Sequence, residues 1–270
     1  MKNILNEKIY ILWALAIILC TALALYCVFF LAVRPADSAS SLTDASVAET
    51  TADSESLLTD SSVTDTKVDC VLQPTEDMGS LYQSRMVFAG DITTSDLKYY
   101  NAITDASQIM VPDDGNLSLR NYNSALINYA DSGEYVTLPQ AIAKKQPDLL
   151  VLTLGRDDYS LTESDFKEAY RDLIAAVRAS SPATVILCQS IFPVEEFYTE
   201  VSNEDIDRMN AWIIDICSQL GCYYLNTAET LKTTDGALSG DYSAGDGVQI
   251  SALGCSAVLS YIRSHAIPGA

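Results

Sequence analysis

The feature that most constrains the fold is the alternation of short apolar runs with longer amphipathic segments after residue 77. Buried strands are predicted at residues 85–89, 148–154, 184–189 and 222–225, and more weakly at 108–111. Between and after these runs, apolar residues recur at helical spacing over residues 163–179, 203–220 and 251–264. Strands that alternate with helices predict an α/β domain of three layers, α/β/α, in which helices cover both faces of a mainly parallel sheet.

The two longer predicted helices each have one apolar face. Ser164 is expected to cap the first of them, because a serine hydroxyl can accept a hydrogen bond from a free backbone N–H of the first turn. The residues predicted to face inward are Phe166, Tyr170, Leu173, Ile174 and Val177 on the first helix, and Ile206, Met209, Ile213, Ile216 and Cys217 on the second.

A second apolar pattern, residues 9–33, contains no charged residue. As a helix it would be about 37 Å long at 1.5 Å per residue, and this length spans a hydrocarbon core of ~30 Å. A cleaved signal peptide, with cleavage near residues 36–39, is the alternative, although its apolar core usually has only about 7–15 residues. Lys2 and Lys8 precede the segment, so residues 1–8 are expected to be cytoplasmic, with the bulk of the chain outside the cell membrane.

Residues 34–76 are rich in Ser, Thr, Asp and Ala, and almost lack aromatic residues. Such a segment cannot bury enough apolar surface to offset its ordering entropy, so it is predicted to be a disordered acidic linker before a domain at residues 77–270. The whole chain carries 36 acidic and 16 basic residues. Its net charge of −20 argues against a nucleic-acid partner, which would require clustered basic residues.

Cysteine usage points to neither a disulfide framework nor a metal site. After the apolar segment there are five cysteines at irregular spacing, namely Cys70, Cys188, Cys217, Cys222 and Cys255. Cys188, Cys217 and Cys255 fall on predicted core faces and are interpreted as small buried hydrophobic residues, with a Cys217–Cys222 bridge as the alternative. The chain has one histidine and no metal-binding pattern, so no cofactor or resident metal is expected.

Three short motifs fall where ligands bind in sheets of this kind, beyond the carboxyl ends of the strands. They are residues 90–93 (GDIT), 155–158 (GRDD) and, before the last helix, 246–249 (DGVQ). In this order and spacing they resemble the SGNH/GDSL hydrolase family over about residues 84–266. The resemblance implies a flavodoxin-like sheet and, where the catalytic residues are intact, an esterase or O-deacetylase of acylated glycans.

The catalytic residues of the family do not carry over to this chain. The resemblance places the nucleophilic Ser at Ile92, the oxyanion-hole Asn at Asp157 and the general-base His at Gln249, so that only Asp246 of the triad remains. An isoleucine cannot attack, a glutamine does not titrate, and a carboxylate repels the negative charge of the intermediate. The backbone-donor glycine of the family is either Gly115 or replaced within residues 119–121.

These substitutions predict a non-catalytic domain that binds an envelope glycan or protein, or acts as a scaffold. Its ligand cleft is expected to comprise Asp91, Ile92, Thr93, Arg156, Asp157, Asp158, Asp246 and Gln249. The first alternative is an active esterase with Thr93 or Ser95, beside Thr94, as an atypical nucleophile. The second is a cation site on Asp91, Asp157, Asp158 and Asp246, although turn-forming roles are preferred for Asp91 and Asp246. His265 is expected to be solvated, at the end of the last helix.

Overall fold

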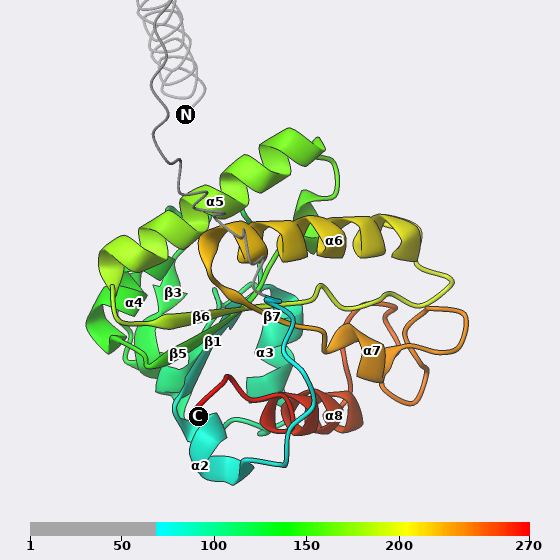
Figure 1. The fold of residues 1–270 in the computed structure, drawn as a ribbon, viewed down its shortest axis with the longest axis horizontal. Helices are drawn as coiled ribbons and strands as arrows, with labels where there is room; N and C mark the ends of the chain where they lie inside the picture. Colours follow the sequence, from blue (N-terminus) through cyan, green and yellow to red (C-terminus); the bar gives the residue numbers. More distant parts are fainter. Residues whose placement is uncertain (1–68) are drawn as a thin grey trace, which may run out of the picture. The chain divides into compact units, whose positions relative to one another are not determined.

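The computed structural model describes residues 69–270, which form an α/β domain around one parallel sheet (Figure 1). The sheet consists of β1 (Met86–Gly90), β2 (Ile109–Met110), β5 (Leu149–Thr153), β6 (Val185–Gln189) and β7 (Tyr223–Leu225). Its strands lie in the order β2-β1-β5-β6-β7, and every neighbouring pair is parallel. This is the flavodoxin-like order, and the prediction of a parallel α/β sheet is confirmed.

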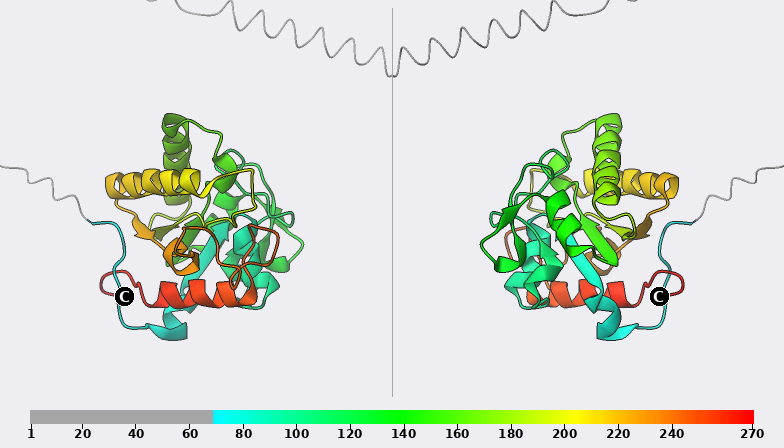
Figure 2. Two further views of the ribbon diagram at one scale, coloured as in Figure 1. Left: turned by 90° about the vertical axis from the view of Figure 1, so that its right-hand side faces the viewer. Right: turned by 90° about the vertical axis from the view of Figure 1, so that its left-hand side faces the viewer.

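Helices cover both faces of the sheet. In Figure 1, α4 (Leu138–Lys145), α5 (Glu163–Ser180) and α6 (Asn203–Leu220) lie on one face, and α2 (Gly79–Ser84), α3 (Ile92–Tyr99), α7 (Ala228–Leu231) and α8 (Ala252–Arg263) on the other. Figure 2 shows the same layers from the sides. A small hairpin of β3 (Ile127–Asn128) and β4 (Tyr135–Val136) and the 3₁₀ turns η1 (Ala106–Gln108), η2 (Tyr129–Asp131) and η3 (Arg156–Asp158) complete the domain.

Two hydrophobic cores lie between the layers. Successive strand residues point to opposite faces, so Val87 and Ala89 of β1 pack with α4, α5 and α6, whereas Met86 and Phe88 pack with α2, α3 and α8. All four are at most 1% exposed, and burial of a large apolar side chain contributes about 1.5–3 kcal/mol. Both cores therefore hold β1 rigidly, and β1 ends at the candidate site.

The predicted faces of α5 and α6 are confirmed, since every inward-facing residue named above is buried. The predicted cap is wrong. Thr162, rather than Ser164, precedes α5, and its hydroxyl accepts a hydrogen bond from the Asp165 N–H at 3.2 Å. The helix begins two residues earlier than the Ser164 cap implies because Thr162 is the residue with extended backbone at its start.

Residues 69–76 belong to the folded domain, although the sequence places them in the linker. Val71 forms a parallel bridge with Tyr224 of β7, and Leu72 N donates to Tyr224 O at 2.9 Å. Cys70 and Leu72 are buried. The domain therefore begins before Asp77, because this short segment covers the open edge of β7.

In the described part of the chain, no helix is both long enough and apolar enough to cross a membrane. The predicted cytoplasmic tail, membrane-spanning residues 9–33 and most of the predicted linker lie outside residues 69–270. The cysteines after the apolar segment are all buried, as expected for Cys188, Cys217 and Cys255, and Cys217 and Cys222 form no bridge.

Candidate functional site

The first motif forms the junction between β1 and α3. Asp91 is the N-cap of α3, and its Oδ1 accepts hydrogen bonds from Thr93 N at 3.0 Å and Thr93 Oγ1 at 2.7 Å. Ile92, at the family's nucleophile position, is the first residue of the helix. The predicted turn-forming role of Asp91 is thus observed, and its carboxylate is 4% exposed.

Gly115 lies directly against Ile92. A Cβ built on Gly115 would stand 2.4 Å from Ile92 Cδ1 and 3.1 Å from Ile92 Cα, closer than any side chain can approach. Of the two positions considered for the family's donor glycine, Gly115 is the one that this contact favours. Its N–H donates to Pro112 O at 2.8 Å, so this amide is already used within its own loop.

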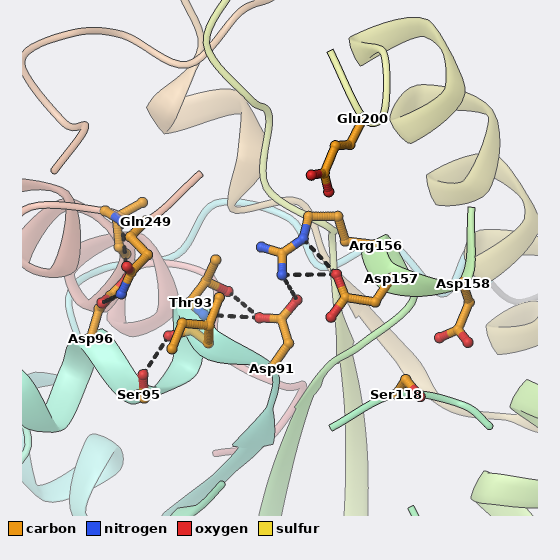
Figure 3. Close-up of polar contacts among 12 residues, drawn as sticks. Asp91, Thr93, Ser95, Asp96, Ser118, Arg156, Asp157, Asp158, Glu200 and Gln249 are labelled. Atoms are coloured by element: carbon orange, nitrogen blue, oxygen red, sulfur yellow. Dashed lines mark hydrogen bonds and ion pairs between the residues drawn. The ribbon is translucent and has the colours of Figure 1, made fainter. Parts of the chain in front are cut away.

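Arg156 occupies the centre of the site. Its Nε and Nη2 each donate to Asp157 Oδ1 at 3.0 Å, and Nη2 lies 3.4 Å from Asp91 Oδ2. Figure 3 shows its guanidinium between the two carboxylates, with Glu200 on its other side. The adjoining cavity, lined by Asp91, Thr93 and Arg156 among others, has no room for a water molecule. The guanidinium therefore fills the space beside the former nucleophile position.

In this group one guanidinium pairs with two carboxylates. Burial opposes the charge of Arg156, but Asp91 and Asp157 outweigh it and raise the Arg156 pKa. Burial likewise raises the pKa of Asp91, and Arg156 offsets part of that rise. Nη1 of Arg156 is buried and has no hydrogen-bond partner among residues 69–270. A cation already sits between two of the carboxylates proposed as cation ligands, so they are poorly suited to bind a second one.

Asp158 faces away from this group, toward the loop after β2. It is fully buried, and it accepts hydrogen bonds from Leu119 N at 2.9 Å and Arg120 Nε at 3.1 Å. Arg120 Nη2 also donates to Asp157 O at 2.8 Å. Burial raises the pKa of Asp158, while Leu119 and Arg120 act in the opposite direction. Asp158 is therefore a positioning residue that ties η3 to the 112–126 loop, and Figure 3 shows it apart from Asp91.

The third motif is joined to α3 through a residue that the sequence did not single out. Gln249 Nε2 donates to Asp96 Oδ1 at 2.8 Å, and Ile250 N to Asp96 Oδ2 at 3.0 Å. Burial raises the pKa of Asp96 to about 6. The sequence offers one signal for a buried role of Asp96: this charged residue lies next to Leu97 on the buried side of the helix. The side-chain amide of Gln249 thus bonds to Asp96 and not to Asp246.

Asp246 is an exposed turn residue, as expected. Its Oδ1 accepts hydrogen bonds from Val248 N at 2.9 Å and Gln249 N at 2.7 Å. The structure therefore brings Asp91, Arg156 and Asp157 together and leaves Asp158 and Asp246 outside their contacts. Among residues 69–270, no group of three or more His, Cys, Asp or Glu side chains is arranged to hold a metal ion.

The hydroxyl groups near Ile92 have no histidine beside them. Thr93 Oγ1 donates to Asp91 Oδ1, and Ser95 Oγ donates to Ile92 O at 2.6 Å. Thr94 Oγ1 is buried without a hydrogen-bond partner in the described domain. His265 lies beyond the C-terminal end of α8, where it stacks on Tyr261 with 3.6 Å between ring centroids. The prediction that His265 is solvated is wrong, because this stacking leaves the residue only 8% exposed.

Comparison with known proteins agrees with this geometry. The model of the GDSL-like Lipase/Acylhydrolase family matches residues 106–255, more than half of the 270-residue chain. The matched segment includes Gly115 and the second and third motifs, but begins after Ile92. No curated protein matches the chain significantly.

Solved structures of similar fold include a protein assigned as an acylhydrolase from Bacteroides fragilis. It is 13% identical, has a TM-score of 0.50, and aligns over 66% of this chain and 84% of its own. An acetyl-xylooligosaccharide esterase variant from Geobacillus Stearmophilus is 14% identical, with a TM-score of 0.46 over 67% of this chain and 94% of its own. At such identities the likeness concerns the fold. The family model, which matches more than half of the chain, shows the assignment: the chain belongs to the GDSL-like lipase/acylhydrolase family.

Proposed function

We propose that this chain is a non-catalytic member of the family, anchored in the cell membrane by residues 9–33, whose domain outside the membrane binds an envelope glycan or protein or acts as a scaffold. The observation that carries the proposal is the contact of Ile92 with Gly115. An aliphatic side chain packed into the nucleophile position cannot form an acyl intermediate.

The rest of the site supports the same proposal. Arg156 fills the space beside Ile92, Asp157 stands at the oxyanion-hole position, and Gln249 at the base position is bonded to Asp96. In a Ser-His-Asp hydrolase, loss of the nucleophile or the base alone costs about 10⁶ in kcat. A chain that lacks both is expected to retain negligible esterase activity, while the loops around the site remain available for binding.

The membrane anchor is supported by the sequence. Residues 9–33 form an uncharged run long enough to cross a bilayer, and Lys2 and Lys8 precede it. With that orientation the domain lies outside the cytoplasm, and its net negative charge disfavours adsorption to anionic lipid. Protease treatment of intact cells tests this topology: the domain should be cleaved from outside, whereas protection until lysis would reverse it.

The catalytic part of the proposal is tested with p-nitrophenyl acetate on a fragment of residues 69–270. The fragment begins at residue 69 because residues 69–76 pack on β7. The natural domain should hydrolyse the ester no faster than buffer. An Ile92→Ser/Asp157→Asn/Gln249→His variant should gain activity, and the matched control with Ile92→Ala in place of Ile92→Ser should not. Turnover by the natural domain that disappears with Thr93→Val would contradict the proposal.

An active esterase with an atypical nucleophile is the competing function. It would require Thr93 or Ser95 to attack. The Thr93 hydroxyl donates to the Asp91 carboxylate, which is already paired with Arg156, and the Ser95 hydroxyl donates to Ile92 O, which is not a base. A fluorophosphonate probe decides between the two functions. We expect no covalent adduct by mass spectrometry, and an adduct on either residue would favour the esterase.

A further inference from the structure

An open pocket of about 550 Å³ lies on the loop that follows β2, on residues 112–126 and Tyr135 of β4. Its volume falls in the range of small-molecule sites, about 300–1,000 Å³. The same loop carries Gly115, which packs against Ile92. One part of the loop thus packs against Ile92, and another part forms the wall of this pocket.

The polar groups of the pocket can both donate and accept hydrogen bonds. Tyr135 Oη donates to Asp113 Oδ2 at 2.9 Å, and Asp114 Oδ1 accepts from Asn116 N at 3.0 Å. Each carboxylate therefore keeps a second oxygen that makes no hydrogen bond to the described domain. The exposed Asn116 side chain adds an amide that donates and accepts. Alternating donors and acceptors of this kind match the hydroxyl groups of a sugar.

The pocket also has apolar walls. Leu126 and Tyr135 line it and are each 52% exposed. An exposed aromatic ring with a polar tip can cover the C–H face of a sugar ring while its hydroxyl remains hydrogen-bonded. Both side chains lie on the same pocket and offer apolar surface to a ligand.

The loop is held firmly in place. Leu117 and Leu119 are at most 3% exposed, and Asp158 accepts hydrogen bonds from Leu119 N and the Arg120 side chain. Within the loop, Asn121 Oδ1 accepts from Ser118 N at 2.8 Å and Asn121 Nδ2 donates to Asn116 O at 2.8 Å. A site fixed in this way loses little entropy when a ligand binds.

The charge of the pocket selects among sugars. Asp113 and Asp114 contribute two carboxylates, and no Lys or Arg is among the described residues that line the pocket. Their negative charge disfavours phosphorylated and uronic-acid ligands. An uncharged sugar is compatible with the lining, because its hydroxyls can donate to the carboxylate oxygens.

We propose that this pocket binds an uncharged saccharide, with Tyr135 and Leu126 against the sugar ring and Asp113, Asp114 and Asn116 bonded to its hydroxyls. The inference rests on the proposed binding function and gives it a ligand class. It assigns recognition to the loop beside Ile92 and not to the space that Arg156 fills.

The test uses the full chain in a detergent without a sugar head group, with the tetramers of N-acetylglucosamine and of xylose as probes. We expect saturation-transfer NMR signals from at least one of them and none from a galacturonic acid tetramer. Tyr135→Ala and Asn116→Ala should each weaken binding at least tenfold. The control Phe197→Ala removes an aromatic residue that is 61% exposed elsewhere and should leave binding unchanged.

Each remaining outcome has one meaning. Absence of signal from both neutral tetramers, or equal binding by Tyr135→Ala, overturns the saccharide site. Preferential binding of the galacturonic acid tetramer overturns it too, because the carboxylates should exclude that ligand. If the saccharide site is overturned but the natural chain remains inert toward p-nitrophenyl acetate in the same preparation, the proposed non-catalytic role still stands. Thermal unfolding of each variant confirms that it is folded.

Discussion

The side chain of Ile92 and the α-carbon of Gly115 are in direct contact, although 22 residues of chain, which include β2, lie between them. A Cβ on Gly115 would stand 2.4 Å from Ile92 Cδ1, and Gly115 has a φ of +69°. The glycine is required both by its backbone conformation and by the isoleucine beside it. The contact joins the start of α3 to the loop that forms the proposed sugar pocket.

Gly115→Ala should therefore destabilise the domain by about 2–5 kcal/mol. The left-handed backbone accounts for about 1–2 kcal/mol, and overpacking against Ile92 typically adds about 1–3 kcal/mol. Urea unfolding of residues 69–270 measures the loss. Gly133→Ala is the matched control, since Gly133 has a φ of +81° with nothing within 4 Å of an added Cβ. Equal losses at both positions would show that the Ile92 contact contributes nothing.

Arg156→Met should destabilise the domain by about 3 kcal/mol at pH 7, because it leaves the buried Asp91 carboxylate without its cation. The loss should shrink as the pH falls, since Asp91 can then be protonated. Adding Asp91→Asn should restore part of the stability. Lys98→Met, which breaks the exposed pair with Asp131, is the control and should cost less than about 1 kcal/mol. A loss no larger than this control would remove Arg156 as a structural cation.

Asp96 should make the domain less stable as the pH rises from about 4 to about 6. Its pKa is raised by burial from 3.8 to about 6 in the folded state, so the folded domain binds more protons than the unfolded chain between these values. Asp96→Asn lacks this titration. The difference in thermal unfolding midpoint, natural domain minus variant, should therefore be larger at pH 4 than at pH 7.5. A difference that grows with pH would contradict the assignment.

The buried thiols should be inert until the domain unfolds. Burial raises the pKa of Cys255 to about 12, and a hydrogen bond with Cys188 together with burial raises that of Cys222. Because the thiolate is the reactive form, we expect no rapid reaction of the folded fragment with Ellman's reagent at pH 8. In urea all five cysteines of residues 69–270 should react. One rapidly reacting thiol in the folded domain would show that part of its core opens readily.

The sequence alone determined the strands of the main sheet, three of the helices that cover it and the layers of the domain. Strand and helix periods are local properties, so the runs at 148–154 and 184–189 predicted β5 and β6, and the apolar faces of α5 and α6 were predicted residue by residue. The order of the motifs along the chain was enough to indicate the family. The absence of Ser and His at the aligned positions was also readable without a structure.

The tertiary structure decided how these residues act. Gln249 and Asp96 are 153 positions apart, and only the packing of α3 beside the last motif brings them together. The sequence placed Arg156 in the cleft, but only the fold shows that its guanidinium lies between Asp91 and Asp157. The sugar pocket depends on where the 112–126 loop lies against Ile92 and Asp158. Such contacts join segments that are distant in the sequence, so no local sequence pattern specifies them. The directions of side chains at the sheet edge depend on how the loops pack.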